Sequence, residues 1–179
     1  MECIFCNNEV LNHEIRGNSN ISEVKCETCG NFSISNEVFA DFSDSQFQDE
    51  HAKISAYIHS KNRDNINPYI VMNEDTAKQN MNATWIKTII DNYPNQISKI
   101  IDEALLNLHN KTDYIGQTIN IIPNKDYPLL HLDSDKSMAF KYMIEQLEEM
   151  NYISDKTIGA NHTAESNWKV ELKADGLKR

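Results

Sequence analysis

Four cysteines form the strongest chemical pattern in the sequence. Cys3 and Cys6 make one Cys-x-x-Cys pair, Cys26 and Cys29 make a second, and nineteen residues separate the two pairs. Zn²⁺ accepts four thiolates in a tetrahedron at about 2.3 Å, and a closed Cys₄ shell leaves no position for water. We therefore expect all four cysteines to hold one structural zinc ion that performs no chemistry. Gly30, which follows the second pair, relieves crowding where the backbone turns back toward the sulfurs.

Two other uses of paired cysteines are disfavoured. Disulfides form in oxidising compartments, and the chain opens with Met1-Glu2-Cys3, which has neither a basic start nor an apolar run of signal-peptide length. A redox Cys-x-x-Cys motif normally occurs singly at a helix N-terminus, and not as two matched pairs. Zinc binding would use every cysteine of the chain, so that no thiol is left as a nucleophile. These points favour a metal site in a cytoplasmic protein.

The composition is that of a globular protein. Of 179 residues, 40% are hydrophobic and 25% are charged, which is enough apolar material for a core. No apolar stretch approaches the roughly 18 residues that span a bilayer, so we expect no membrane association. The formal charge is −10, from 17 basic and 27 acidic residues. This balance disfavours non-specific binding to nucleic acid, which depends on Lys and Arg releasing counterions from phosphates.

The elements that must position the cysteines divide the chain into three parts. Residues 1–35 are expected to form a zinc ribbon, in which short strands flank the second cysteine pair. Residues 36–94 are expected to form a helical linker region, and residues 95–179 a winged-helix-like domain. The sequence therefore predicts a mainly α fold with a small β part (α+β), in which a Cys₄ zinc ribbon precedes a helical body that ends in a winged-helix-like unit.

Hydrophobic periodicity and capping residues set the expected elements. The clearest pattern is a core helix from Gln96, whose apolar residues follow helical spacing: Ile97, Ile100, Ile101, Ala104, Leu105 and Leu108. The other expected helices are a short piece capped by Ser35 or Asn36, residues 47–61, a start at 73–76, residues 83–91 and residues 134–150. Extended runs are expected at 68–72, 152–153 and 168–172, and the runs 119–122 and 128–132 are strands or connectors.

The C-terminal part resembles a winged-helix domain. The segment Leu147–Ile153 is similar to the junction in that fold where a helix ends, the chain turns and a strand starts. The segment from Val170 to Leu177 is similar to the strand and glycine-containing end of the same fold. The resemblance implies that Phe140–Met150 is the third helix and that residues 155–166 are the wing. This junction occurs in many unrelated regulators, so it speaks for the fold more than for the function.

The whole layout resembles a more specific group of bacterial proteins. The matching features are the two cysteine pairs with Gly30, an aromatic residue and Ile34-Ser35 just after them, the helix segment Ile54–Ile58, and the run Pro68-Tyr-Ile-Val. Proteins of that group carry a Toll/interleukin-receptor-like or nucleoside-deoxyribosyltransferase-like domain after this region and are associated with phage defence. The resemblance implies a non-catalytic sensing or interaction module, the regulatory N-terminal part of such an effector, with a protein partner or a second copy as its ligand.

A DNA-binding regulator is the alternative that the winged-helix resemblance implies. Winged-helix proteins often place the third helix in the major groove. The candidate contacts are two lysines of that helix and two at the wing, Lys136, Lys141, Lys156 and Lys169. The same helix carries Glu145, Glu148 and Glu149, which would face phosphates unfavourably unless they lie on its opposite side. A solvated helix face explains the lysines equally well.

An enzyme is the least favoured class. The acidic residues between 44 and 50 lie near a helix start, where they complement the helix dipole. Asp102 and Glu103 lie near His109 at helical spacing, but no partner residue marks a catalytic pair. The sequence also contains no glycine-rich phosphate loop, no Gly-x-Ser-x-Gly and no His-Glu-x-x-His motif. We therefore expect this chain to be non-catalytic.

Overall fold

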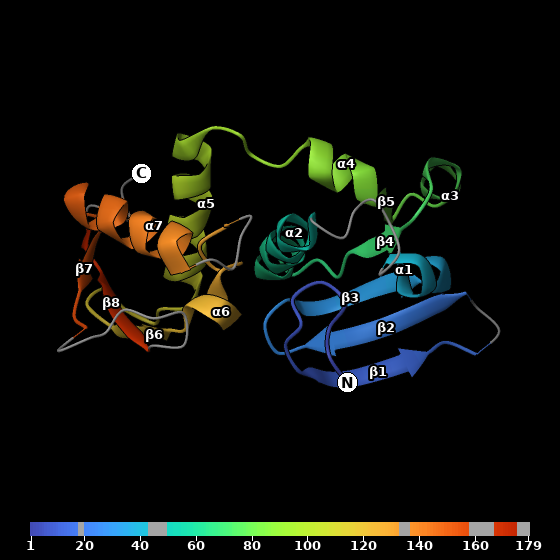
Figure 1. The fold of residues 1–179 in the computed structure, drawn as a ribbon, viewed down its shortest axis with the longest axis horizontal. Helices are drawn as coiled ribbons and strands as arrows, with labels where there is room; N and C mark the ends of the chain where they lie inside the picture. The colour runs from blue at the N-terminus through green and yellow to red at the C-terminus, as the bar shows by residue number, and fades with distance from the viewer. Residues whose placement is uncertain (18–19, 43–49, 133–136, 158–166, 175–179) are drawn as a thin grey trace. The chain divides into compact units, whose positions relative to one another are not determined.

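The chain forms two compact units. In the computed structural model, unit 1 comprises Met1–Tyr93 and unit 2 comprises Pro94–Arg179 (Figure 1). The residues that the structure describes are 1–17, 20–42, 50–132, 137–157 and 167–174. Each unit contains its own sheet, so each can be considered separately.

Unit 1 is built on a five-stranded mixed sheet with the order β1-β2-β3-β4-β5. Strand β2 is antiparallel to both β1 and β3, whereas β3, β4 and β5 run parallel to one another. The strands are β1 Val10–Ile15, β2 Ile21–Cys26, β3 Gly30–Ser35, β4 Tyr69–Val71 and β5 Ala83–Trp85. The expected ribbon and the segment after it therefore contribute to one sheet, because β3 of the ribbon pairs with β4.

Short helices connect the strands of unit 1. They are α1 Asn36–Asp41, α2 His51–Arg63, α3 Glu74–Gln79 and α4 Ile86–Asp91. Two of them have the caps that the sequence predicts, since Ser35 Oγ accepts the Val38 N–H at 3.3 Å and Asn73 Oδ1 accepts the Thr76 N–H at 2.8 Å. The longest, α2, packs on β3 and buries Ala52, Ile54, Ser55, Ala56 and Ile58.

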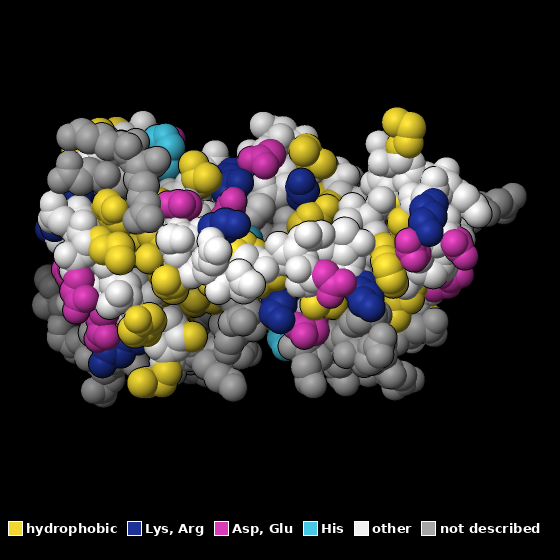
Figure 2. All heavy atoms as spheres, turned by 90° about the horizontal axis from the view of Figure 1, so that it is seen from above, with side chains coloured by type: hydrophobic (Ala, Val, Ile, Leu, Met, Phe, Trp, Pro, Cys, Tyr) yellow, Lys and Arg dark blue, Asp and Glu magenta, His cyan; other side chains and the backbone are white. Residues whose placement is uncertain are grey.

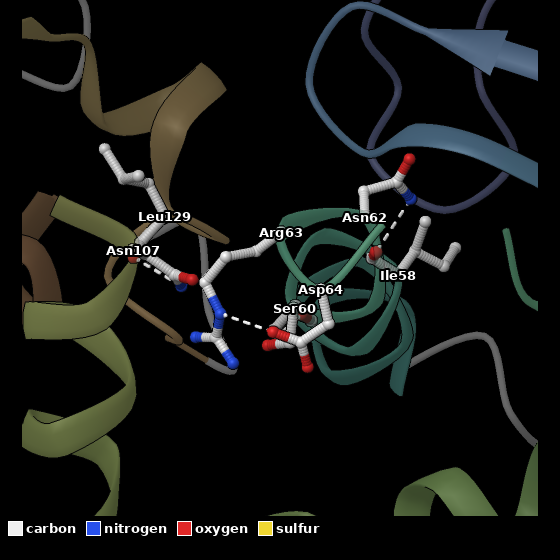
Figure 3. Close-up of polar contacts among 8 residues, drawn as sticks. Ile58, Ser60, Asn62, Arg63, Asp64, Asn107 and Leu129 are labelled. Atoms are coloured by element: carbon white, nitrogen blue, oxygen red, sulfur yellow. Dashed lines mark hydrogen bonds and ion pairs between the residues drawn. The ribbon is translucent and has the colours of Figure 1, made fainter. Parts of the chain in front are cut away.

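Unit 2 combines two long helices with a three-stranded antiparallel sheet. Its elements are α5 Ile97–Asn110, β6 Thr118–Ile121, α6 Pro123–Asp126, α7 Ser137–Glu149, β7 Ile153–Asp155 and β8 Trp168–Leu172. The sheet order is β6-β8-β7 (Figure 1). Its core is apolar and aromatic: the Phe140 and Trp168 rings meet edge to face with centroids 5.5 Å apart. Asn107 is buried in α5, where its Nδ2 donates to the Leu129 carbonyl at 2.9 Å (Figure 3).

The prediction of a mainly α fold with a small β part is wrong. The structure is 42% helix and 25% strand, which makes it a mixed α/β protein. The error comes from unit 1, where β1 carries the polar residues Asn12, His13 and Glu14, and β4 and β5 have three residues each. Such strands show too few alternating apolar residues to be recognised locally, because pairing with distant strands stabilises them.

Several helix boundaries also differ from expectation. The helix expected over 83–91 begins as strand β5 and becomes helical only at Ile86, since Ala83 pairs with Tyr69 of β4. The helix expected over 47–61 is observed as α2, while residues 43–49 lie outside the described part. The run 128–132 forms turns, and its leucines are buried. Among the described residues, no helix is both long enough and apolar enough to cross a membrane.

Candidate metal centre

The sulfurs of the four cysteines converge on one point in unit 1. Cys3 Sγ lies 3.9 Å from Cys29 Sγ, Cys6 Sγ lies 3.4 Å from Cys26 Sγ, and all four sulfurs are within 4.8 Å of one another. Sulfurs bound tetrahedrally at 2.3 Å would be about 3.8 Å apart. No cysteine is more than 6% exposed. The four residues that the spacing singled out therefore fit around one metal ion.

The first knuckle is a tight turn closed by its own backbone. The Cys3 carbonyl accepts the Asn7 N–H at 2.9 Å, and the Cys3 N–H donates to the Asn8 carbonyl at 2.8 Å. Asn7 has a φ of 58°, in the left-handed region that asparagine tolerates better than most residues. This turn brings Cys3 and Cys6 to the same side.

Phe5 anchors the first knuckle in the core of unit 1. Its side chain is fully buried, with its ring centroid 5.5 Å from that of Phe32 in β3 and 5.0 Å from that of Phe42 after α1. The contact with Phe42 is edge to face, a favourable arrangement for aromatic pairs. The knuckle is therefore held by apolar packing as well as by its sulfurs.

The second knuckle joins β2 to β3. Cys26 is the last residue of β2, and its Sγ accepts the backbone N–H of Cys29 at 3.4 Å. Gly30 follows at the start of β3 with a φ of 92°, which only glycine adopts without strain. A Cβ at Gly30 would also lie 2.7 Å from Cγ of Asn62. The sequence explains this glycine by backbone freedom alone, and the structure adds a steric reason.

Asn62, near the end of α2, clamps the strand that leaves the second knuckle. Its Oδ1 accepts the Asn31 N–H at 2.8 Å, and its Nδ2 donates to the Asn31 carbonyl at 2.8 Å. The same Nδ2 donates to the Ile58 carbonyl one turn earlier in α2, at 2.9 Å (Figure 3). The amide therefore connects the helix to the backbone two residues after Cys29.

Ser55 makes a second contact between α2 and the metal centre. Its Oγ lies 3.0 Å from Cys29 Sγ, and both side chains are completely buried. Ser55 and Asn62 are seven residues apart and so lie on one face of the helix. Groups that hydrogen-bond to metal ligands orient those ligands and tune the metal.

The four thiols are not equivalent. The pKa of Cys29 is raised well above its ordinary value. Burial is the main cause, and the neighbouring sulfurs add to it. Hydrogen bonds from the side chains of Cys29 and Cys3 lower the pKa of Cys26. Metal binding requires all four as thiolates, so an ion that enters the site must displace the protons of the buried thiols.

Sequence reasoning missed both α2 residues. The helix expected over 47–61 ends just before Asn62, and the segment Ile54–Ile58 contains Ser55 but predicts no role for it. The available signal was a small polar residue on the buried face of an apolar helix, since a buried hydroxyl needs a partner. Nothing in the sequence indicated that the partner is a cysteine 26 residues earlier.

Of the four candidate nucleic-acid contacts, the structure describes Lys141, Lys156 and Lys169. Lys141 Nζ lies 3.6 Å from a Glu145 carboxylate oxygen, and Lys156 Nζ lies 3.6 Å from one of Glu171. The backbones of Lys156 and Lys169 are adjacent, since the Lys156 N–H donates to the Lys169 carbonyl at 2.7 Å, and Lys169 is exposed. Lys136 lies outside the described residues, as does most of the expected wing.

The chain was compared with protein-family models, with curated proteins and with solved structures, and none of the three comparisons gave a match. The metal centre thus has to be interpreted from its own geometry.

Proposed function

We propose that the four cysteines bind one structural Zn²⁺ ion and that the chain is a non-catalytic interaction module. The observation that carries the proposal is the closed, buried set of four sulfurs tied to the core through Phe5 and α2. Four thiolates in tetrahedral reach of one point suit zinc, and a full shell leaves no position for a substrate. The ion would hold the two knuckles together, while the cysteines, Phe5 and Asn62 orient the strands around it.

Elemental analysis of the purified full chain tests the zinc site. The expected result is one zinc per chain, and its loss in a Cys26→Ser variant. A chain that contains no zinc after expression in zinc-containing medium, or a Cys26→Ser variant that keeps full zinc and stability, would contradict the proposal.

The exposed side of α7 favours a protein partner. Met138 is 74% exposed and Tyr142, one turn later, is 54% exposed. Glu145 and Glu149 continue the same exposed stripe toward the end of the helix. Aromatic residues and methionine are enriched in protein interfaces, whereas carboxylates repel phosphates. A stripe that is apolar at one end and acidic at the other suits a protein segment better than DNA.

A role as the regulatory part of a bacterial defence-type effector is the finer proposal. Its support is the sequence resemblance of the cysteine pairs, the Ile54–Ile58 segment and the Pro68 run to the N-terminal region of such proteins. It predicts that the gene encodes a nucleotide-processing domain in frame with this chain. Sequencing past Arg179 tests it, and a stop codon directly after that residue would argue against it.

A DNA-binding regulator remains the second candidate because of the element order in unit 2. A winged-helix domain has the order helix, strand, two helices and two strands, with the first and last strands adjacent. Unit 2 has this order of elements, and its sheet order is β6-β8-β7. On the face that Figure 2 shows, however, basic and acidic side chains of the described residues are interspersed. Fluorescence anisotropy with several duplex probes at physiological salt decides the question. We expect no binding; salt-dependent binding that Lys169→Ala weakens would establish the alternative.

A further inference from the structure

Ser55 places a hydroxyl in the core of unit 1, against the metal centre. Its side chain has no solvent exposure, and its Oγ lies 3.0 Å from Cys29 Sγ. Ser60, five residues later in the same helix, instead donates to the Ala56 carbonyl at 3.0 Å, a common bond for a serine within a helix. The two serines of α2 therefore have different partners, and only the Ser55 hydroxyl contacts a candidate metal ligand.

Metal binding fixes the direction of the Ser55 bond. While Cys29 is a thiol, either the hydroxyl or the S–H group can be the donor. A metal-bound thiolate has no proton and can only accept. The hydroxyl must then donate to Cys29 Sγ, and a hydrogen bond to a charged acceptor is stronger than one between neutral groups.

The bond makes the four ligands unequal. Cys29 is completely buried and contacts the hydroxyl, while Cys26 accepts a longer bond from the Cys29 backbone N–H at 3.4 Å. Cys6 is the most exposed of the four, at 6%. A hydrogen bond withdraws electron density from a thiolate and so reduces its nucleophilicity. Burial and hydrogen bonding therefore both protect Cys29, whereas Cys6 has more access to solvent.

We infer that Ser55 is a positioning residue that donates to the metal-bound thiolate of Cys29 and makes this cysteine the last of the four to react with an electrophile. The inference rests on the proposed zinc site. It assigns α2 a chemical effect on the centre, in addition to its packing on β3.

The test is alkylation of the zinc-loaded full chain with N-ethylmaleimide, followed by mass spectrometry of each cysteine. In the wild type, Cys6 should be modified first and Cys29 last. Ser55→Ala should speed modification of Cys29 by about tenfold, which matches the lower end of the effect on metal affinity when a group that supports a metal ligand is removed. Ser60→Ala is the matched control, because it removes a hydroxyl from the same helix without touching a cysteine, and it should leave the rates unchanged.

Cobalt gives a second readout that loosened packing alone would not shift. In the Co²⁺-loaded chain, loss of the hydrogen bond raises the energy of the sulfur electrons, so Ser55→Ala should move the sulfur-to-cobalt charge-transfer band to longer wavelength. An unchanged band, a Cys29 rate within twofold of the wild type, or a wild type in which Cys29 is not last would each overturn the inference. A wild type that binds neither zinc nor cobalt would instead refute the proposed zinc site itself.

Discussion

The two units differ in the side chains that stabilise their small cores. Among its described residues, unit 1 has one helix of 13 residues, three helices of six residues and a sheet whose first strand is largely polar, and four cysteines meet where β2 turns into β3. Unit 2 has helices of 14 and 13 residues with buried apolar residues, and a sheet that contains the buried Trp168. Among its described residues no group of three or more potential metal ligands occurs.

The proposed zinc ion would replace hydrophobic area in unit 1, where the strands are short and polar. Small domains bury too little apolar surface to be stable without help, and structural zinc contributes folding free energy directly. Unit 2 obtains its stability from amphipathic helices instead. With zinc in unit 1, the two units should respond differently to metal removal, core truncation and changes in the second knuckle.

The largest effect should come from removing the metal. Zinc binding contributes about 10–16 kcal/mol in small zinc domains, which is as large as the whole free energy of unfolding expected for a unit of this size. Chelation of the full chain should therefore unfold the strands of unit 1 and leave unit 2 folded. Hydrogen exchange measured by mass spectrometry would show fast exchange in β2 and β3 with α5 and α7 still protected. Equal loss of protection in both units would show that unit 2 also depends on the metal.

Truncating the core of unit 2 should give the opposite pattern. Trp168 is 2% exposed and contacts Phe140, so Trp168→Ala should destabilise unit 2 by about 3–5 kcal/mol through the cavity it leaves. Zinc content should stay at one per chain, because the cysteines belong to unit 1. Denaturant unfolding together with elemental analysis measures both quantities. A variant that lost its zinc would show that the two units are not independent.

Gly30→Ala should have an intermediate effect confined to unit 1. The alanine would have to adopt a φ of 92° and its Cβ would meet the Asn62 amide, so we expect a cost of about 3 kcal/mol. Gly17→Ala is the matched control, since Gly17 also has a positive φ, of 39°, but no atom within 4 Å of the new Cβ. In thermal unfolding of the zinc-loaded chains, the Gly30→Ala variant should have a much lower melting temperature than the Gly17→Ala variant. The reverse order would refute the steric role of Asn62.

The smallest effect is expected from Asn62→Ala, which tests whether α2 supports the metal centre. Asn62→Ala removes both hydrogen bonds to Asn31 and should cost about 1–2 kcal/mol, with faster zinc loss to a chelator. Asn92→Ala is the control. Near the end of α4, Asn92 Nδ2 donates to the Thr88 carbonyl four residues earlier at 2.8 Å, just as Asn62 Nδ2 donates to the Ile58 carbonyl in α2. It should change stability less and leave the rate of zinc loss unaltered. Equal rates of zinc loss would mean that the Asn62 clamp does not support the centre.

The predictable features of this protein are local in sequence. The four cysteines are recognised by their spacing, and the caps Ser35 and Asn73 by the residue type at a helix start. Strand β5 and the contact between Ser55 and Cys29 depend on segments far apart in the chain. A single sequence contains propensities and patterns but not the pairing partner, which explains why the site's ligands were found and its supporting residues were missed.

The Asn62 clamp has a further consequence for solubility. Strand β3 pairs with β4 at Ser33 and Ile34, so within the described part of the chain no strand lies beside β3 on that side at Asn31. A free N–H and C=O on a strand can template pairing with another chain, the first step of edge-to-edge aggregation. The amide of Asn62 occupies both groups of Asn31 and thereby acts as a one-residue substitute for a neighbouring strand. The same side chain that supports the second knuckle thus also protects the exposed edge from intermolecular pairing.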